Sequence, residues 1–295
     1  MTDLVTIFCE VSDFCKEFEQ QFGKMYLTSG ERIRNRACRM ELSEIMTISI
    51  LYHSSGYSTF KDYYIKHVCQ FQDKDFHLVS YNRFIELRKF AILPMFLFLS
   101  LKKLSPCTGV SFIDSFKLEA CHIKRAYSHK TLQGVASKGK TSVGWFYGMK
   151  VHLVINHKGE IVSFYITSGH VADNNATVLY KLTKEVIGKL FGDKGYIVRP
   201  EIFKKLYKNG TQLITKIRSN MKNKLMPLVD KLLLSKRGVI ESVGDILKEH
   251  LQLEHSRHRS VWGSFLHILT SLTAYQIREK KPSISAELIK SITPA

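Results

Sequence analysis

The spacing of apolar residues changes near residue 107, and this change constrains the fold more than any other feature. Before it, apolar side chains recur at the helical interval, as they do between Ile7 and Phe22. After it, they alternate with small or polar residues from Val110 to Leu118, which is typical of a half-buried strand. Ser105-Pro106 and Thr108-Gly109 interrupt the chain between the two patterns. We therefore expect a helical segment followed by an α/β segment.

The first segment, residues 1–106, is predicted to be an α-helical N-terminal domain. Helices are expected over residues 7–22, from Ser43 as an N-cap to a break at Gly56, over 57–71, and over 81–104. By itself this pattern fits a plain packed bundle.

The second segment, residues 107–282, is predicted to be an α/β domain, with a tail over 283–295. Strands are expected over 110–120, 145–155 and 160–167, and the glycine in Asn156-His157-Lys158-Gly159 favours a hairpin between the last two. The remaining elements should alternate: helix 174–189, strand 189–193, helix 200–208, strand 212–215, and helices 237–250 and 261–277.

Charge points to a polyanionic partner. The 295 residues hold 44 Lys and Arg against 26 Asp and Glu, a net charge of +18. Nucleic acid is the first candidate, since neutralised phosphates release counterions. An anionic membrane surface is the rival, and solubility alone is the simplest alternative.

Nothing in the sequence indicates secretion or membrane insertion. Residues 1–11 include Asp3 and Glu10 and no basic leader, and the longest apolar run is broken by Pro94. The six cysteines form no CxxC pair, and neither they nor the histidines show the spacing of a structural zinc site. We expect a soluble, intracellular protein with reduced thiols.

Two aspartates end apolar runs. Asp114 follows Phe112-Ile113, and Asp193 follows Leu190-Phe191-Gly192. A carboxylate is costly there unless it is paired or bound to a metal ion. Either residue alone could simply cap a turn, but two in one predicted core favour a functional site.

A third acid, Glu241, lies on a predicted helix with Arg237 four residues before it and Lys248 seven after. An exposed helix with i,i+4 charge pairs would give the same pattern. If Glu241 instead faces the two aspartates, the three carboxylates form a nest for hard cations, and the basic residues would face phosphates.

The sequence resembles the DDE transposases of bacterial insertion sequences, closest to the insertion-sequence 982 family. The resemblance covers nearly the whole chain. It is carried by FIDSFKLEACHIKR from Phe112, GKTSVGWFYGMKVHLVINHKGEIVSF from Gly139, KLFGDKGYI from Lys189, LITKIRSNMKN from Leu213, and KRGVIESV with LEHSRHRS from Lys236. GDKGY and the Trp-Phe-Tyr-Gly-x-Lys-x-His run are specific together.

The resemblance implies a ribonuclease-H-like catalytic core that binds two Mg²⁺ or Mn²⁺ ions through Asp114, Asp193 and Glu241. Related transposases carry Tyr-x2-Arg-x3-Glu-x6-Lys; here Leu234 stands at the Tyr position, and Glu254 is the runner-up for the third acid. His170 and Ala172 also depart from the family pattern. With Gly244, which costs about 1 kcal/mol of helix propensity relative to Ala, they suggest a decaying copy.

The implied partner is double-stranded DNA, both terminal inverted repeats and target, bound by a homodimer in the bacterial cytosol. The helices of residues 1–106 would bind the DNA ends or support dimerisation. The residues expected to contact it are Arg125, Lys150, Lys194, Arg218, Lys222, Arg237, Lys248, Arg257 and Arg259. Lys150 and His152 could equally face solvent, and Trp145, Phe146 and Tyr147 could stack on a flipped base or pack in the sheet.

The expected function is DNA cleavage and strand transfer. A metal-dependent nuclease of the same fold and an inactive copy that only binds DNA are the alternatives.

Overall fold

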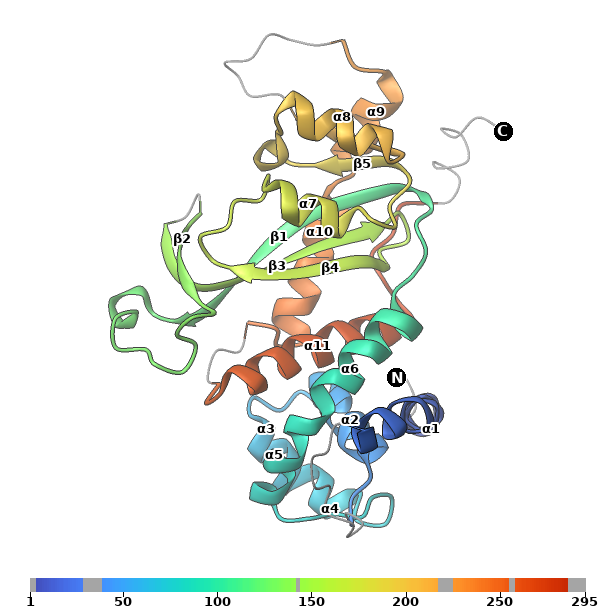
Figure 1. The fold of residues 1–295 in the computed structure, drawn as a ribbon, viewed down its shortest axis with the longest axis vertical. Helices are drawn as coiled ribbons and strands as arrows, with labels where there is room; N and C mark the ends of the chain where they lie inside the picture. Colours follow the sequence, from blue (N-terminus) through green and yellow to red (C-terminus); the bar gives the residue numbers. More distant parts are fainter. Residues whose placement is uncertain (1–3, 29–38, 142–143, 217–224, 255–257, 286–295) are drawn as a thin grey trace. The chain divides into compact units, whose positions relative to one another are not determined.

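The computed structural model describes residues 4–28, 39–141, 144–216, 225–254 and 258–285. The chain divides into two compact units; the ribbon in Figure 1 is coloured along the sequence. The first unit contains Met1–Lys103, Leu247–Leu253 and Arg259–Glu279; the second contains Leu104–Ile246, Glu254–His258 and Lys280–Ala295.

The first unit is helical throughout its described elements. These are α1 (Leu4–Thr28), α2 (Leu42–Leu51), α3 (Phe60–Tyr63), α4 (Cys69–Phe71), α5 (Tyr81–Arg88), α6 (Ile92–Phe98) and α11 (Val261–Ile277), with short 3-10 or π segments η1 (Tyr52–Ser54), η2 (Tyr64–Val68), η3 (Lys89–Ala91) and η4 (Leu99–Lys103). Ser43 is not the cap of α2: Glu41 is, and it forms a capping box with Glu44.

Helix α11 belongs to this helical unit, although the expected α/β domain included it. Every residue from Leu266 to Tyr275 is buried, so the helix must be covered on all sides. Helices α2 and α6 contact it. The buried ring of His53 fixes the arrangement, with Nε2 at 2.8 Å from the Thr270 hydroxyl and Nδ1 at 2.7 Å from the Leu251 carbonyl. Helical periodicity reveals that a helix is buried but not which domain buries it.

The second unit is built on a mixed six-stranded sheet in the order β2-β3-β1-β5-β6, with β4 also paired to β3. The strands are β1 (Gly109–Cys121), β2 (Ser137–Lys140), β3 (Trp145–Asn156), β4 (Ile161–Ser168), β5 (Gly188–Gly192) and β6 (Thr211–Thr215). Neighbours are antiparallel from β2 to β1 and in the β3–β4 hairpin, whereas β1, β5 and β6 run parallel. The expected hairpin is confirmed: the Gly159 amide donates to the Asn156 carbonyl at 3.0 Å.

The helices of this unit are α7 (Ala176–Leu182), α8 (Pro200–Lys208), α9 (Leu228–Ser235) and α10 (Gly238–Asp245), with 3-10 turns η5 (Ile123–Arg125) and η6 (Lys194–Tyr196). After α10 the chain enters the π-helical segment η7 (Ile246–His250), within which it passes into the first unit. The helix expected over 174–189 ends at Leu182. Strand β2 and helix α9 were not expected at all.

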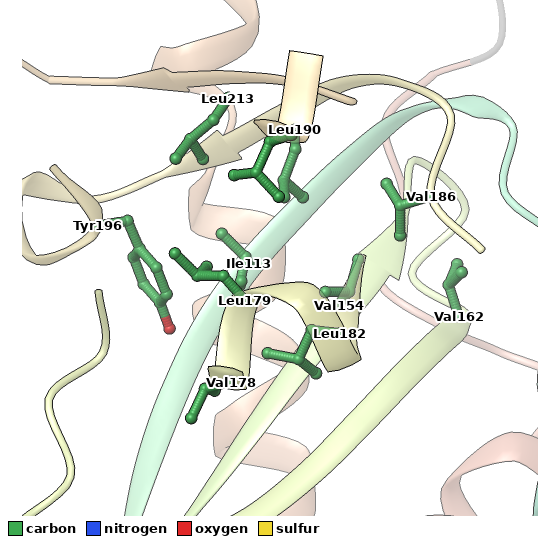
Figure 2. Packing of buried hydrophobic residues seen from close by; sticks show 11 residues of the cluster. Ile113, Val154, Val162, Val178, Leu179, Leu182, Val186, Leu190, Tyr196 and Leu213 are labelled. Atoms are coloured by element: carbon green, nitrogen blue, oxygen red, sulfur yellow. The ribbon is translucent and has the colours of Figure 1, made fainter. Parts of the chain in front are cut away.

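Helix α7 packs against one face of the sheet. Figure 2 shows its Val178, Leu179 and Leu182 directed at Ile113 of β1 and Val154 of β3. Side chains alternate between faces along a strand. Phe116, three residues after Ile113, therefore lies on the other face, where α10 packs (Figure 1). The two faces of β1 thus meet different helices around Asp114 and Ser115.

Within the described residues, no helix is long and apolar enough to cross a membrane.

Candidate active site

Asp114 lies in the middle of β1, and Asp193 directly follows the end of β5, the parallel neighbour of β1. Phe112 of β1 is registered with Phe191 of β5 in the last pair between these strands. Asp114 and Asp193 each follow two residues later, and parallel strands lie about 4.8 Å apart. The negative charge of Asp193 contributes to raising the pKa of Asp114. The structure therefore brings the two sequence-predicted aspartates together.

Asp114 is held in a fixed, largely desolvated position. Its Oδ1 accepts the backbone N–H of Ser115 at 2.9 Å, and its Oδ2 accepts Nη1 of Arg237 at 3.1 Å. Burial raises the pKa of this carboxyl to about 6, although Arg237 and the Ser115 amide oppose the shift. A carboxylate kept this close to protonation next to a second carboxylate is one that a cation would stabilise.

Helix α10 brings the third predicted acid to the same place through Arg237. This guanidinium forms ion pairs with both Asp114 and Glu241. The Arg237 and Asp114 side chains are 16% and 19% exposed, whereas Glu241 is 56% exposed. The i,i+4 charge pair considered from sequence is therefore real, and it lies beside the aspartates rather than on a remote surface.

Gly244 lets α10 approach β1 closely. A Cβ atom at this position would lie 2.3 Å from the Phe116 ring, well inside van der Waals contact. Phe116 is two residues from Asp114 and so on the same face of β1, and Gly244 is three residues from Glu241 and so on the same side of the helix. The glycine has a packing reason, which corrects its interpretation as a sign of decay.

Asp193 both caps a turn and lies at the site. Its Oδ1 accepts the Gly195 backbone N–H at 2.8 Å, at the start of η6. A Cβ on residue 195 would stand 2.9 Å from that same oxygen, so a larger residue there would require the Asp193 side chain to shift. Lys194, expected to contact DNA, is exposed next to it.

The sequence prediction did not include a fourth carboxylate, Asp173. Its Oδ1 accepts the Ser115 hydroxyl at 2.8 Å and the Lys150 ammonium at 3.1 Å. His152 Nδ1 lies 3.9 Å from the same oxygen, and burial lowers the pKa of this imidazole to about 4. Lys150 and His152 are therefore buried and face neither solvent nor an open surface. The one signal was the family resemblance around Gly169–Asp173.

Tyr196 links this cluster to the two aspartates. Its buried hydroxyl has a pKa raised well above the usual value, chiefly by burial and then by the charges of Asp173 and Asp114. The charges of Asp173 and Asp114 therefore act on the same hydroxyl. Asp173 itself contacts Ser115, which faces the α7 side of β1, whereas Asp114 faces the opposite side.

The other residues expected at DNA are dispersed. Arg125 is exposed in η5, and Lys248 and Arg259 belong to the helical unit. Lys248 was predicted to share one helix face with Arg237, on the basis of 3.6 residues per turn. It lies instead in the π-helical segment η7, where that repeat does not apply. Three more lie outside the described residues: Arg218, Lys222 and Arg257. Glu254, the alternative third acid, is exposed in a turn.

The carboxylates of Asp114, Asp193 and Glu241 are of the chemical type that binds a hard divalent cation, but Arg237 is paired with both Asp114 and Glu241. Oxygen ligands are those that Mg²⁺ and Mn²⁺ prefer. Among the described residues, no group of three His, Cys, Asp or Glu side chains is gathered closely enough to hold a metal ion. The Asp114 and Asp193 carboxylates have the chemistry that such an ion needs, whereas Glu241 and Asp114 are both paired with Arg237.

Comparison with protein families gives one match. A family model described as a transposase DDE domain matches residues 104–261, more than half of the 295-residue chain. The chain belongs to the DDE transposase family. Comparison with curated proteins gives no match. The matched range of this transposase contains Asp114, Asp193 and Glu241 as well as Asp173.

Family membership fixes the general function. A transposase acts on DNA, and DDE transposase domains generally use divalent metal ions. The mixed α/β architecture of the second unit is consistent with such a domain.

Proposed function

We propose that this transposase cleaves DNA at the ends of an insertion sequence and joins them to target DNA, with Asp114, Asp193 and Glu241 as ligands of two Mg²⁺ or Mn²⁺ ions. The observation that carries the proposal is that Asp114, within β1, and Asp193, directly after β5, lie on adjacent parallel strands, with Arg237 of α10 bound to Asp114. Three antiparallel strands extended by two parallel ones support a ribonuclease-H-like core, and the sequence motifs support membership in the insertion-sequence 982 group.

Each residue has a distinct part in this proposal. When bound, the cations activate the attacking oxygen and stabilise the leaving oxygen of an in-line phosphoryl displacement. Asp114 binds from within β1 and Asp193 from directly after β5, and their hydrogen bonds to backbone amides limit movement. Arg237 neutralises Asp114 and Glu241 beforehand; once released, its guanidinium suits a DNA phosphate.

The remaining parts of the proposal concern partners. Double-stranded DNA, first as terminal inverted repeats and then as target, is the substrate. The helical unit binds the repeats and supports a homodimer on DNA. The net charge of +18 favours such a polyanion, and the setting would be the bacterial cytosol.

A strand-transfer assay tests this function. Inverted repeats bracketing the gene define a terminal duplex, which is incubated with the protein, Mg²⁺ and a plasmid target. We expect cleaved ends and joined products, and a loss of more than about 100-fold in Asp114→Asn, Asp193→Asn and Glu241→Gln. Mutation of residues that merely orient metal ligands already lowers metal affinity or activity by about 10- to 100-fold.

Two results would contradict the proposal. Cleavage without joining would indicate a metal-dependent nuclease, and DNA binding without either reaction would indicate an inactive copy.

A further inference from the structure

The outer edge of the sheet carries a basic surface without acidic residues. Residues 120–149 contain no Asp or Glu. The segment includes five basic residues, all of them exposed: Lys124, Arg125, Lys130, Lys138 and Lys140. Within the described part of the chain, none of the five forms an ion pair with a carboxylate. Figure 1 shows β2 and the loop before it at the end of the sheet away from β5 and β6.

Two aromatic rings are exposed on this same edge. Tyr127 is 89% and Trp145 62% exposed, whereas the neighbouring Phe146 and Tyr147 are buried in the sheet. Each exposed ring has a lysine beside it: the Lys138 Nζ lies 3.9 Å from the Tyr127 ring centre, and the Lys140 Nζ lies 5.7 Å from that of Trp145. We call these four side chains the aromatic–basic edge.

The aromatic–basic edge is held in place by the sheet. Lys140 is registered directly opposite Trp145 in the β2–β3 pair. The Ser137 hydroxyl accepts the His170 backbone N–H at 2.9 Å and lies 2.8 Å from its Nδ1, so β2 is anchored beyond the end of β4. Such anchoring lowers the ordering cost of binding a ligand.

The edge lies well away from the catalytic carboxylates. Trp145 precedes Leu153, the β3 partner of Asp114, by eight residues along the strand. At about 3.3 Å per residue this separation is roughly 25 Å. The aromatic–basic edge therefore cannot touch the reacting phosphodiester and must meet another part of the nucleic acid.

We propose that the aromatic–basic edge binds unpaired nucleotides of a DNA strand, with Trp145 and Tyr127 stacking on bases and Lys138 and Lys140 contacting the flanking phosphates. This inference rests on the proposed action on DNA. Exposed rings within a basic groove are how proteins hold single strands, because every base offers a face to stack on. Paired bases in a duplex have no free face. The edge of a second copy is excluded as the occupant, since it would present the same positive charges.

The chain contains two tryptophans, Trp145 and Trp262, which allows a direct test. Trp262 is also exposed, so Trp262→Phe should fold and leave Trp145 as the sole reporter. A 20-nucleotide oligo(dT) is added in EDTA, so that no cleavage occurs. We expect the emission of Trp145 to be quenched, and expect a duplex of equal charge to quench it far less. Trp145→Phe, which reports Trp262, is the matched control and should show little quenching.

The affinity measurement separates stacking from charge. Trp145→Ala should weaken oligo(dT) binding by about 5- to 150-fold and duplex binding little, whereas Lys140→Ala should weaken both. Tyr127→Ala, at a fully exposed ring, repeats the test should Trp145→Ala fail to fold.

Three results would each overturn the proposal. Trp145→Ala could lose the same affinity for the duplex as for the single strand, the emission of Trp262→Phe could show no quenching, or a single-stranded RNA of the same length could bind more tightly than oligo(dT). Asp114→Asn should retain the quenching. Failure of this inference is thereby distinguished from failure of the proposed catalysis.

Discussion

Asp114 shows how a single residue is tuned by its surroundings. Burial disfavours its charge, and Asp193 adds repulsion, while Arg237 and the Ser115 amide stabilise the carboxylate. The outcome is a pKa of about 6, above the ordinary value of about 3.9. In the metal-free protein, the folded state therefore holds a proton at Asp114 over a pH range in which the unfolded chain has released it.

The stability of metal-free protein should reflect this shift. Because the folded pKa is the higher one, the stabilising contribution is present at low pH and is lost as the pH rises through about 6. Relative to Asp114→Asn, which cannot titrate, the wild type should gain up to about 1.4 kcal/mol in unfolding free energy per unit as the pH falls from 6 to 5. Urea unfolding in EDTA measures the difference. A wild type that instead loses stability against the variant over this interval would contradict the assigned pKa.

At the residue scale, the sequence predicted the acids that directly follow an apolar run. Asp114 and Asp193 each follow a buried apolar run, where a carboxylate is costly to desolvate, and this cost indicated a role for both. Asp173 follows no such run, and its partners Ser115 and Lys150 lie 58 and 23 residues away in sequence. Only the strand pairing brings them together, so no local pattern could have identified the cluster.

At the scale of elements, the decisive contact is α10 against β1. Gly244 and Phe116 set the distance between them, and thereby set where Arg237 and Glu241 stand relative to Asp114. The sequence predicted the helix and its charge spacing but interpreted the glycine by helix propensity alone. The packing partner was missing because it comes from a strand more than a hundred residues earlier.

Gly244→Ala should therefore destabilise the protein and slow cleavage. The added methyl overlaps the Phe116 ring, and overpacking of this kind costs about 1–3 kcal/mol, which outweighs the gain of about 1 kcal/mol in helix propensity in most of that range. Gly238→Ala is the matched control in the same helix, where a Cβ meets nothing within 4 Å. Urea unfolding of both variants checks the prediction. Equal stability of Gly244→Ala and wild type would show that α10 does not need this close approach.

Other elements were missed for local reasons. Strand β2 consists of Ser137-Lys138-Gly139-Lys140 and has no apolar alternation, since it is a short edge strand whose backbone pairs with β3. Helix α7 ends at Leu182 with Thr183 as its C-cap, whose hydroxyl donates to the Leu179 carbonyl at 2.8 Å, and residues 183–187 connect it to β5.

At the scale of the whole molecule, the change of apolar period near residue 107 agrees with the start of the second unit at Leu104. It could not show that the chain returns to the first unit through residues 247–253 and α11. That return depends on which helices cover α11, and the sequence pattern of one helix does not name its partners. The sheet order, which places Asp114 beside Asp193, is likewise a property of the assembled fold.

The central claim is that Asp114, Asp193 and Glu241 hold divalent cations, and Mn²⁺ binding to the metal-free protein tests it most directly. Titration calorimetry or electron paramagnetic resonance should show two bound ions in the wild type. Asp114→Asn, Asp193→Asn and Glu241→Gln should each lower the affinity by more than about 10-fold. Glu254→Gln, the matched control at the other candidate acid, should bind as the wild type does. Loss of binding in Glu254→Gln with full binding in Glu241→Gln, or wild-type affinity in both aspartate variants, would contradict the account.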